Sequence, residues 1–187
     1  MGSWMDRAAE MAYRLLVEDA PACLPVNVTE LIRAQNDVEL LTYAQAALLL
    51  DITQETWRWE APSPDAFTLI EHASAPTRYK VFFDDTKPIT RTRFTLAHEL
   101  GHLLFHHAGW EPFASEAVMD CFARHLLCPP ALIPSWEASA LPEDWLCRTF
   151  GLSPAAVQRL RQSPCGRADA LLEQRLCEKF SFLLTPP

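Results

Sequence analysis

The chain has 187 residues, of which 49% are hydrophobic and 21% are charged, a composition that excludes a disordered chain and indicates a globular protein. Its 16 basic and 24 acidic residues give a formal net charge of −8, which argues against a domain that binds nucleic acid or an anionic membrane through a basic surface. The N-terminus has no basic segment followed by an apolar one, and no apolar run reaches the roughly 18 residues of a membrane span, so we expect a cytoplasmic protein that does not bind membranes.

Six cysteines are spread along the chain without a metal-binding or redox spacing. None forms a C-x-x-C motif, and no two have zinc-ribbon spacing. Several lie in apolar stretches, where a free cysteine behaves as a small buried hydrophobic residue. We therefore expect free thiols in a reducing compartment rather than a disulfide framework. The six are Cys23, Cys121, Cys128, Cys147, Cys165 and Cys177.

The first half of the chain mixes helical and extended patterns. Apolar residues recur at helical spacing near the N-terminus, and Pro21 and Pro25 end that pattern. Further on, β-branched and aromatic residues gather in two short runs separated by a turn at 74–77, which predicts an antiparallel pair of strands. We expect, in chain order, helices at 5–17 and 28–35 and strands at 38–43, 67–70 and 78–83.

The second half of the chain is helical. A long segment after the last strand has no proline and a single glycine, and Gly109 ends it. The pair Pro129–Pro130 stops the next helical segment. Gly151 ends a later helix, and the following one has Ser153 as its cap and Pro154 at its first position. We expect helices at 91–107, 115–128, 142–150, 154–162 and 167–184.

The segment His98–His102 reads HELGH, an HExxH motif inside the longest predicted helix. Two histidines at positions i and i+4 lie on one helix face, so both imidazoles can reach one metal ion. Glu99 projects to the edge of such a site, where it can take a proton from a metal-bound water as the general base. The alternative is a pair of histidines on an ordinary surface helix. The mostly apolar flanks, residues 93–97 and 103–105, favour a buried helix, in which these polar groups need partners such as a divalent cation.

A third metal ligand is available on the next predicted helix. Glu116 and Asp120 are again four residues apart, so that Glu116 can coordinate the metal while Asp120 accepts an N–H from a ligating histidine. The alternative is a solvated acidic face, which the helix dipole favours at a helix start. Gly109 and Pro112 lie between the two helices and suit a chain reversal. Three protein ligands with an open fourth position are typical of catalytic zinc.

Two segments resemble a known peptidase family. Residues 95–106 are similar to the active-site helix of ImmA/IrrE-type zinc metallopeptidases, and residues 116–129 are similar to that family's second zinc helix. The Glu116–Asp120 pairing also resembles the glutamate-ligand helix of thermolysin-like zincins. This sequence has Val118 where many relatives carry a second glutamate, and we assign Glu116 as the ligand because Asp120 lies one turn further on.

The resemblance implies an α+β fold, with a small, mostly antiparallel sheet packed against a pair of zinc-binding helices. Residues 1–140 would form the metallopeptidase core, and residues 141–187 would form a helical segment packed on it within one compact domain. Zinc would be held by His98, His102 and Glu116, and Glu99 would be the catalytic base. Such peptidases typically come from bacteria, phages or mobile elements, and the substrate is often a helix-turn-helix repressor.

Three functions are therefore considered. The first is a zinc-dependent metallopeptidase that acts on a regulatory protein, with Tyr43, Tyr79 and several histidines as candidates to stabilise the oxyanion. The second is a non-catalytic, metal-stabilised interaction module, although pure metal binding does not require Glu99. The third is DNA binding through the helix–turn–helix rhythm of residues 141–162, against which the negative charge and the few nearby basic residues argue.

Neighbouring residues have more than one interpretation. His106 shares the face of His102 one turn further on, and it is a helix-end histidine, a spare ligand or a substrate contact. His125 has no suitable spacing from either predicted acidic residue, so we assign it a structural role. The strand at 79–83 is either an edge strand that binds substrate by strand addition, as in zincins generally, or a core strand.

Overall fold

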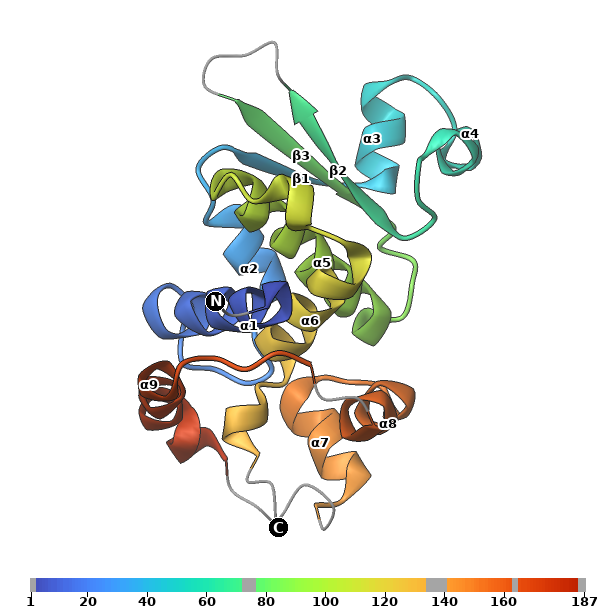
Figure 1. The fold of residues 1–187 in the computed structure, drawn as a ribbon. Coiled ribbons are helices and arrows are strands. Elements are labelled where there is room, and N and C mark those ends of the chain that lie inside the picture. Colours follow the sequence, from blue (N-terminus) through green and yellow to red (C-terminus); the bar gives the residue numbers. More distant parts are fainter. Residues whose placement is uncertain (1–2, 72–76, 134–140, 163–164, 185–187) are drawn as a thin grey trace.

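The computed structural model describes residues 3–71, 77–133, 141–162 and 165–184. The chain forms one small sheet and a larger number of helices (Figure 1). The strands are β1 (Val38–Thr42), β2 (Ala66–Glu71) and β3 (Arg78–Phe83). The α-helices are α1 (Trp4–Glu18), α2 (Val28–Arg33), α3 (Tyr43–Leu49), α4 (Gln54–Glu60), α5 (Ile89–His107), α6 (Glu116–Leu127), α7 (Glu143–Phe150), α8 (Pro154–Gln162) and α9 (Ala170–Phe180), and the short 3-10 helices are η1 (Glu111–Phe113), η2 (Pro130–Leu132) and η3 (Ser181–Leu183).

The elements expected from the sequence are present in the expected order, and the α+β class is confirmed. Gly151 ends α7 in the left-handed conformation with φ of 64°, and the Ser153 hydroxyl accepts the backbone N–H of Ala156 at the start of α8. The last helix is shorter than expected, because Asp169 caps it by accepting the backbone N–H groups of Leu171 and Leu172. The turn expected at 74–77 lies largely outside the described residues.

Two helices between β1 and β2 were not expected. Helix α3 begins with a capping box, in which the Thr42 hydroxyl accepts the Gln45 backbone N–H and the Gln45 side chain accepts the Thr42 backbone N–H. Helix α4 begins where the Thr53 hydroxyl accepts the Thr56 backbone N–H. Both caps are visible in the sequence as threonines three residues before a polar partner, but the apolar periodicity of such short helices is weak.

The sheet is mixed, and the expectation of a mostly antiparallel sheet was wrong. Its strand order is β1–β3–β2, in which β3 runs antiparallel to β2 and parallel to β1. The parallel pairing joins Val38 to Tyr79 and Thr42 to Phe83. The chain reverses direction between β1 and β2, through α3 and α4, and it reverses again between β2 and β3. Strand β3 therefore runs in the same direction as β1.

Strand β3 is the central strand of this sheet, and its interpretation as a substrate-binding edge strand was wrong. Both of its edges already carry neighbours, which leaves no free backbone groups for an added strand. Strand β2 is the edge strand next to α5, with which it is in contact.

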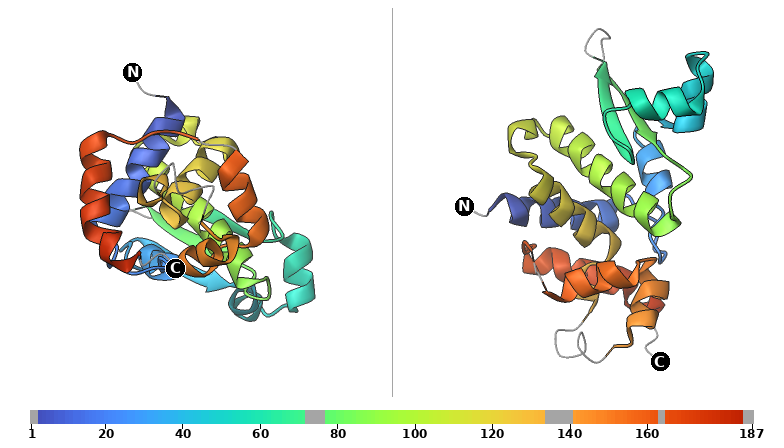
Figure 2. Two further views of the ribbon diagram at one scale, coloured as in Figure 1. Left: turned by 90° about the horizontal axis from the view of Figure 1, so that it is seen from below. Right: turned by 90° about the vertical axis from the view of Figure 1, so that its right-hand side faces the viewer.

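The molecule has the sheet at one end and helices at the other (Figures 1 and 2). Helices α3 and α4 lie beside the sheet, whereas α5 runs beneath it and contacts both β2 and β3. Helix α6 packs between α5 and α1, and α7, α8 and α9 lie at the far end. The buried face of α5 matches the expectation of a largely buried helix and comprises Leu96, Ala97, Glu99, Leu100, Gly101, Leu103 and Phe105.

Two basic side chains connect the C-terminal helices to the rest of the chain. Arg93 of α5 donates to the carbonyl oxygens of Val26 and Phe150, at 2.8 and 3.2 Å. Lys179 of α9 donates to three carbonyl oxygens at the end of α1, those of Leu16, Val17 and Ala20, at 2.6–2.9 Å. The predicted boundary between residues 140 and 141 borders segment 134–140, which lies outside the described residues, and it stays a prediction.

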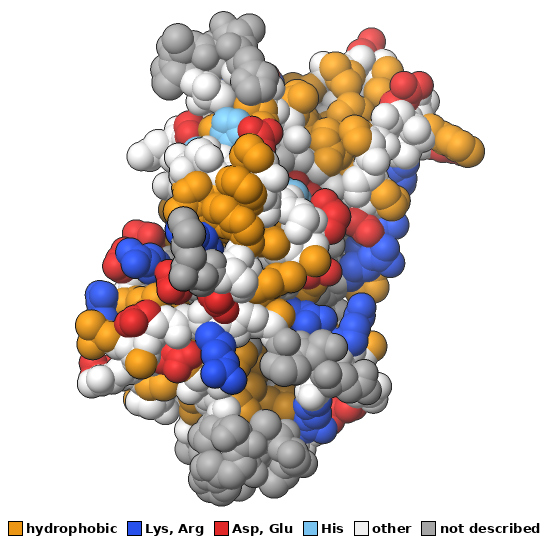
Figure 3. All heavy atoms as spheres, viewed as in Figure 1, with side chains coloured by type: hydrophobic (Ala, Val, Ile, Leu, Met, Phe, Trp, Pro, Cys, Tyr) orange, Lys and Arg blue, Asp and Glu red, His pale blue; other side chains and the backbone are white. Residues whose placement is uncertain are grey.

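Apolar side chains are exposed over α3 and α4, at the upper right of Figure 3. The large exposed side chains there are Leu48, Leu49, Leu50, Ile52 and Trp59. Exposed apolar surface of this kind commonly marks an interaction site.

Among the described residues, no helix combines the length and the apolar character needed to cross a lipid bilayer.

A glycine allows α5 and α6 to approach closely. A Cβ atom at Gly101 would lie 2.9 Å from a ring carbon of Phe122 and 3.0 Å from the sulfur of Met119. Both neighbours belong to α6 and are fully buried, so neither can move without repacking the core. This contact sets how near the first turn of α6 comes to the histidines of α5.

We expect the substitution Gly101→Ala to destabilise the protein. Overpacking costs about 1–3 kcal/mol, which exceeds the gain of about 1 kcal/mol in helix propensity. Thermal unfolding in the presence of a chelator measures the packing effect by itself. An unchanged or raised midpoint temperature would show that α5 and α6 do not depend on this close approach.

Candidate metal centre

Three side chains from α5 and α6 converge at the sheet-facing end of the helix pair. His98 and His102 lie one turn apart on α5, and their Nε2 atoms are 3.2 Å apart. Glu116, the first residue of α6, has carboxylate oxygens 3.2 Å from Nε2 of His98 and 3.6 Å from Nε2 of His102. The chain reverses between the two helices at Gly109, whose φ is +70°, as the predicted hairpin requires. The three predicted ligands therefore come together around one point.

Asp120 lies one turn along α6 and contacts the other nitrogen of His98. Its Oδ1 is 3.0 Å from Nδ1 of His98. A proton on Nδ1, donated to this carboxylate, leaves the lone pair of Nε2 directed at Glu116 and His102. Asp120 thus occupies the orienting position expected for it.

The donor set fits a divalent cation such as zinc. With Nδ1 of His98 protonated, its Nε2 lone pair faces a carboxylate at 3.2 Å, and two acceptors at that distance repel unless a cation lies between them. Burial and the neighbouring His98 lower the pKa of His102, which favours the neutral imidazole that metals bind. Two imidazoles and one carboxylate are a ligand set that zinc accepts, and a four-coordinate ion would keep one position open.

Glu99 is buried beside the ligands, with 9% of its surface exposed. The Thr68 hydroxyl of β2 donates to its Oε2 at 2.7 Å. Burial raises the pKa of Glu99, while the bond from Thr68 and the neighbouring His98 act in the opposite direction. A carboxylate with a raised pKa is suited to accept and return a proton near neutral pH.

The centre opens into a cleft of about 530 Å³ between β2, α5 and the start of α6. Glu116 is 84% exposed at its rim, whereas His98 is only 13% exposed. The cleft therefore gives solvent and a substrate access to the open side of the ligand set. Its other walls include Phe67, Thr68, Ile70, Tyr79, Leu103, His106 and Glu111.

Only one of the two tyrosines that were candidates for oxyanion stabilisation lines the cleft. Tyr43 lies outside the cleft, where its hydroxyl donates to the carbonyl oxygen of Ser63 at 2.6 Å. Tyr79 lines the cleft, and its hydroxyl is 2.7 Å from Nδ1 of His106. His106 is therefore a wall of the cleft as well as a helix-end residue, and its Nε2 lies 3.6 Å from Glu111.

Sequence reasoning missed Thr68 and the Cys121–His125–Cys165 cluster. A single threonine in a strand carries no signal of its own, because its contact with Glu99 joins residues far apart in the chain. The cluster had a signal: Cys121 and His125 are four residues apart on a helix, the same spacing as the histidines of the motif.

The chain matches one known protein family. The family described as Peptidase_M78, IrrE N-terminal-like domain, matches residues 63–160, which is more than half of the chain. The chain belongs to this family. The match contains β2, β3 and the α5–α6 pair, so a metallopeptidase-type domain carries the His98 centre. A search of curated proteins found no match to this chain.

We expect Asp120→Ala to weaken zinc binding roughly 10–100-fold, because the carboxylate orients the His98 ring. Zinc affinity can be measured by competition with a chromophoric chelator. Asp37→Ala is the matched control, since Asp37 pairs with His107 at 3.0 Å, another histidine of α5. Equal affinities for the two variants would contradict the orienting role of Asp120.

Proposed function

We propose that this member of the IrrE-like family is a zinc-dependent endopeptidase whose ligands are His98, His102 and Glu116 and whose general base is Glu99. The observation that carries the proposal is the convergence of these three donors beside a buried carboxylate in an open cleft. The non-catalytic alternative, a metal-stabilised interaction module, would need the same ligands but not a carboxylate in the position of Glu99.

When bound, zinc would act as a Lewis acid toward the scissile carbonyl and lower the pKa of a water ligand toward about 7. Glu99 accepts a proton from the attacking water and passes it to the leaving amine. Thr68 holds the Glu99 side chain by donating to one oxygen, which leaves the other free for that proton. Tyr79 lines the cleft, and we assign it as the donor to the developing oxyanion.

The substrate proposed is a protein segment, and a helix-turn-helix regulator is the substrate class that the family resemblance implies. Edge strand β2 contributes several walls of the cleft, so an extended segment could pair with it while its scissile bond faces Glu99. Pro62 and Ser63, which lie between α4 and β2 in the chain, also line the cleft and offer further contact area.

Direct DNA binding is not proposed. The polar residues that a reading helix would use are engaged within the C-terminal segment: Gln158 donates to Glu143, and Arg161 donates to the carbonyl oxygen of Leu141. Together with the net charge of −8, these contacts support a packing or docking role for α7 and α8.

We expect Glu99→Gln to retain zinc and lose about 10²–10⁴-fold in cleavage rate, because the amide has the carboxylate's shape but cannot accept the proton. Wild type and variant are incubated with a peptide library derived from a bacterial proteome, and new termini are identified by mass spectrometry. Cleavage by the variant at the wild-type rate would exclude Glu99 as the base. A zinc-loaded wild type that cleaves neither the library nor helix-turn-helix proteins would favour the interaction module.

We expect Thr68→Val to raise the pH at which activity is lost on acidification. Loss of the hydrogen bond from Thr68 raises the pKa of Glu99 further, and a base is inactive below its pKa. The measurement is kcat/KM against pH on a cleaved peptide. Thr95→Val is the control, since the Thr95 hydroxyl donates to the Arg91 carbonyl oxygen on α5. An unmoved acidic limb would show that Glu99 does not govern it.

A further inference from the structure

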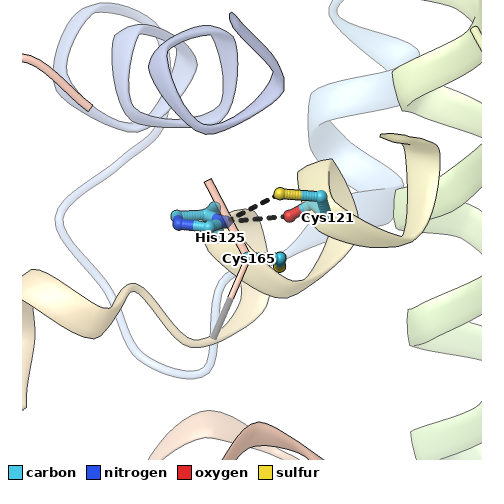
Figure 4. A group of neighbouring side chains, drawn as sticks. All are labelled: Cys121, His125 and Cys165. Carbon is cyan, nitrogen blue, oxygen red and sulfur yellow. Dashed lines mark hydrogen bonds between the residues drawn. The ribbon is translucent and has the colours of Figure 1, made fainter. Parts of the chain in front are cut away.

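A second group of side chains that could hold a metal ion comes from α6 and the segment before α9, and it shares no residue with the His98 centre. Figure 4 shows this group. Cys121 and His125 come from α6, and Cys165 comes from the segment just before α9. One ligand atom from each of the three lies within 4.8 Å of the others. Cys121 and His125 are 1% and 2% exposed, whereas Cys165 is half-buried, so the group lies at the edge of the protein interior.

Helix geometry brings the first two ligands together. Cys121 and His125 are four residues apart and share one face of α6, with Sγ of Cys121 3.6 Å from Nδ1 of His125. Nδ1 of His125 also lies 2.9 Å from the backbone oxygen of Cys121. This pair repeats, with one sulfur in place of one imidazole, the arrangement of the two histidines on α5.

Close backbone packing brings the third ligand to them. Gly166 has φ of +61°, and a Cβ atom there would collide with the carbonyl group of Met5 and lie 3.1 Å from Sγ of Cys121. Only glycine allows this approach, which presses the segment against both α1 and α6. The neighbouring Cys165 is thereby held beside a helix that lies about 40 residues earlier in the chain.

The chemistry of the three donors selects a class of ion. Two sulfurs and one imidazole suit borderline or soft divalent metals such as zinc and cobalt, whereas calcium and magnesium require oxygen ligands. A metal ion bound here would displace the thiol protons and hold Cys121 and Cys165 as thiolates. A buried cation would neutralise that charge in an environment where it is otherwise costly.

We propose that Cys121, His125 and Cys165 bind a second zinc ion, which ties the segment before α9 to α6. A water molecule or the Met5 carbonyl oxygen, 3.5 Å from Sγ of Cys121, can complete four coordination. The role is structural: the ion crosslinks two parts of the chain next to α1. The proposal is independent of the peptidase activity, since it concerns different residues.

Cobalt tests this site selectively, because thiolate ligands give a sulfur-to-cobalt charge-transfer absorption in the near ultraviolet. The His98 centre has no sulfur ligand and gives no such band. Reduced, metal-free wild type titrated with Co²⁺ should develop the band with saturation by two equivalents, since the His98 centre takes up cobalt as well, and Zn²⁺ should abolish it by displacing the cobalt. No such band in folded, reduced wild type at saturating Co²⁺ would overturn the proposal without any variant.

Variants locate the ligands. Cys165→Ser should lose at least half of the band and bind cobalt at least tenfold more weakly, whereas Cys147→Ser, a cysteine on α7 outside the cluster, should behave as wild type. His98→Ala should keep the band. An unchanged band in Cys165→Ser would exclude Cys165 as a ligand. If Cys121 and Cys165 form a disulfide in the purified protein, and their reduced thiols bind no metal, the cluster is a redox pair instead.

Zinc content separates this proposal from the peptidase proposal. Protein loaded with zinc and freed of excess should hold two ions per chain in wild type and one in either Cys165→Ser or His98→Ala. Loss of zinc only in Cys165→Ser would support the second site and contradict the His98 centre. Loss only in His98→Ala would do the reverse.

Discussion

The contact between α5 and α6 at Gly101 is the constraint on which the site depends. Helix α5 supplies His98, His102 and the proposed base Glu99, but the motif on this helix offers only two of the three candidate ligands. The third ligand and the orienting aspartate come from α6, and they reach the histidines because Gly101 lets Phe122 and Met119 pack directly against the α5 backbone. The interior on that side is fully buried, so small changes in volume would be transmitted to the ligand geometry.

Glu99 illustrates how burial and a single hydrogen bond act together. Burial raises the pKa of Glu99, and a carboxyl group that is already protonated cannot accept a proton. Thr68 moderates the rise in pKa by donating a hydrogen bond to one carboxylate oxygen. The bond also links the edge strand β2 to the motif helix. Strand β2 therefore both forms a wall of the cleft and holds the proposed base Glu99 through Thr68. A substrate segment bound to β2 would have its position fixed relative to Glu99.

Helix α6 carries donors for both clusters. Glu116 and Asp120 serve the cleft, and Cys121 and His125 face the segment that precedes α9. Cys121 directly follows Asp120 in the chain, so a metal bound at the cysteine cluster would also restrain the turn of α6 that orients His98. The N-terminal helix α1 takes part through Met5, whose backbone packs against Gly166.

The sequence by itself determined the order of the helices and strands other than α3 and α4, the motif histidines, the neighbouring Glu99 and the acidic pair on the next helix, because these features depend on patterns that are local in the chain. It also carried the family resemblance that the Peptidase_M78 match bears out. Only the tertiary structure decided that β3 is central and parallel to β1, that Thr68 donates to Glu99, that Tyr79 rather than Tyr43 lines the cleft, and that Cys165 joins Cys121 and His125. Each of these relations joins different elements of the fold, as with Thr68 and Glu99, which are 31 positions apart in sequence, and such contacts follow from how the core packs rather than from any local pattern.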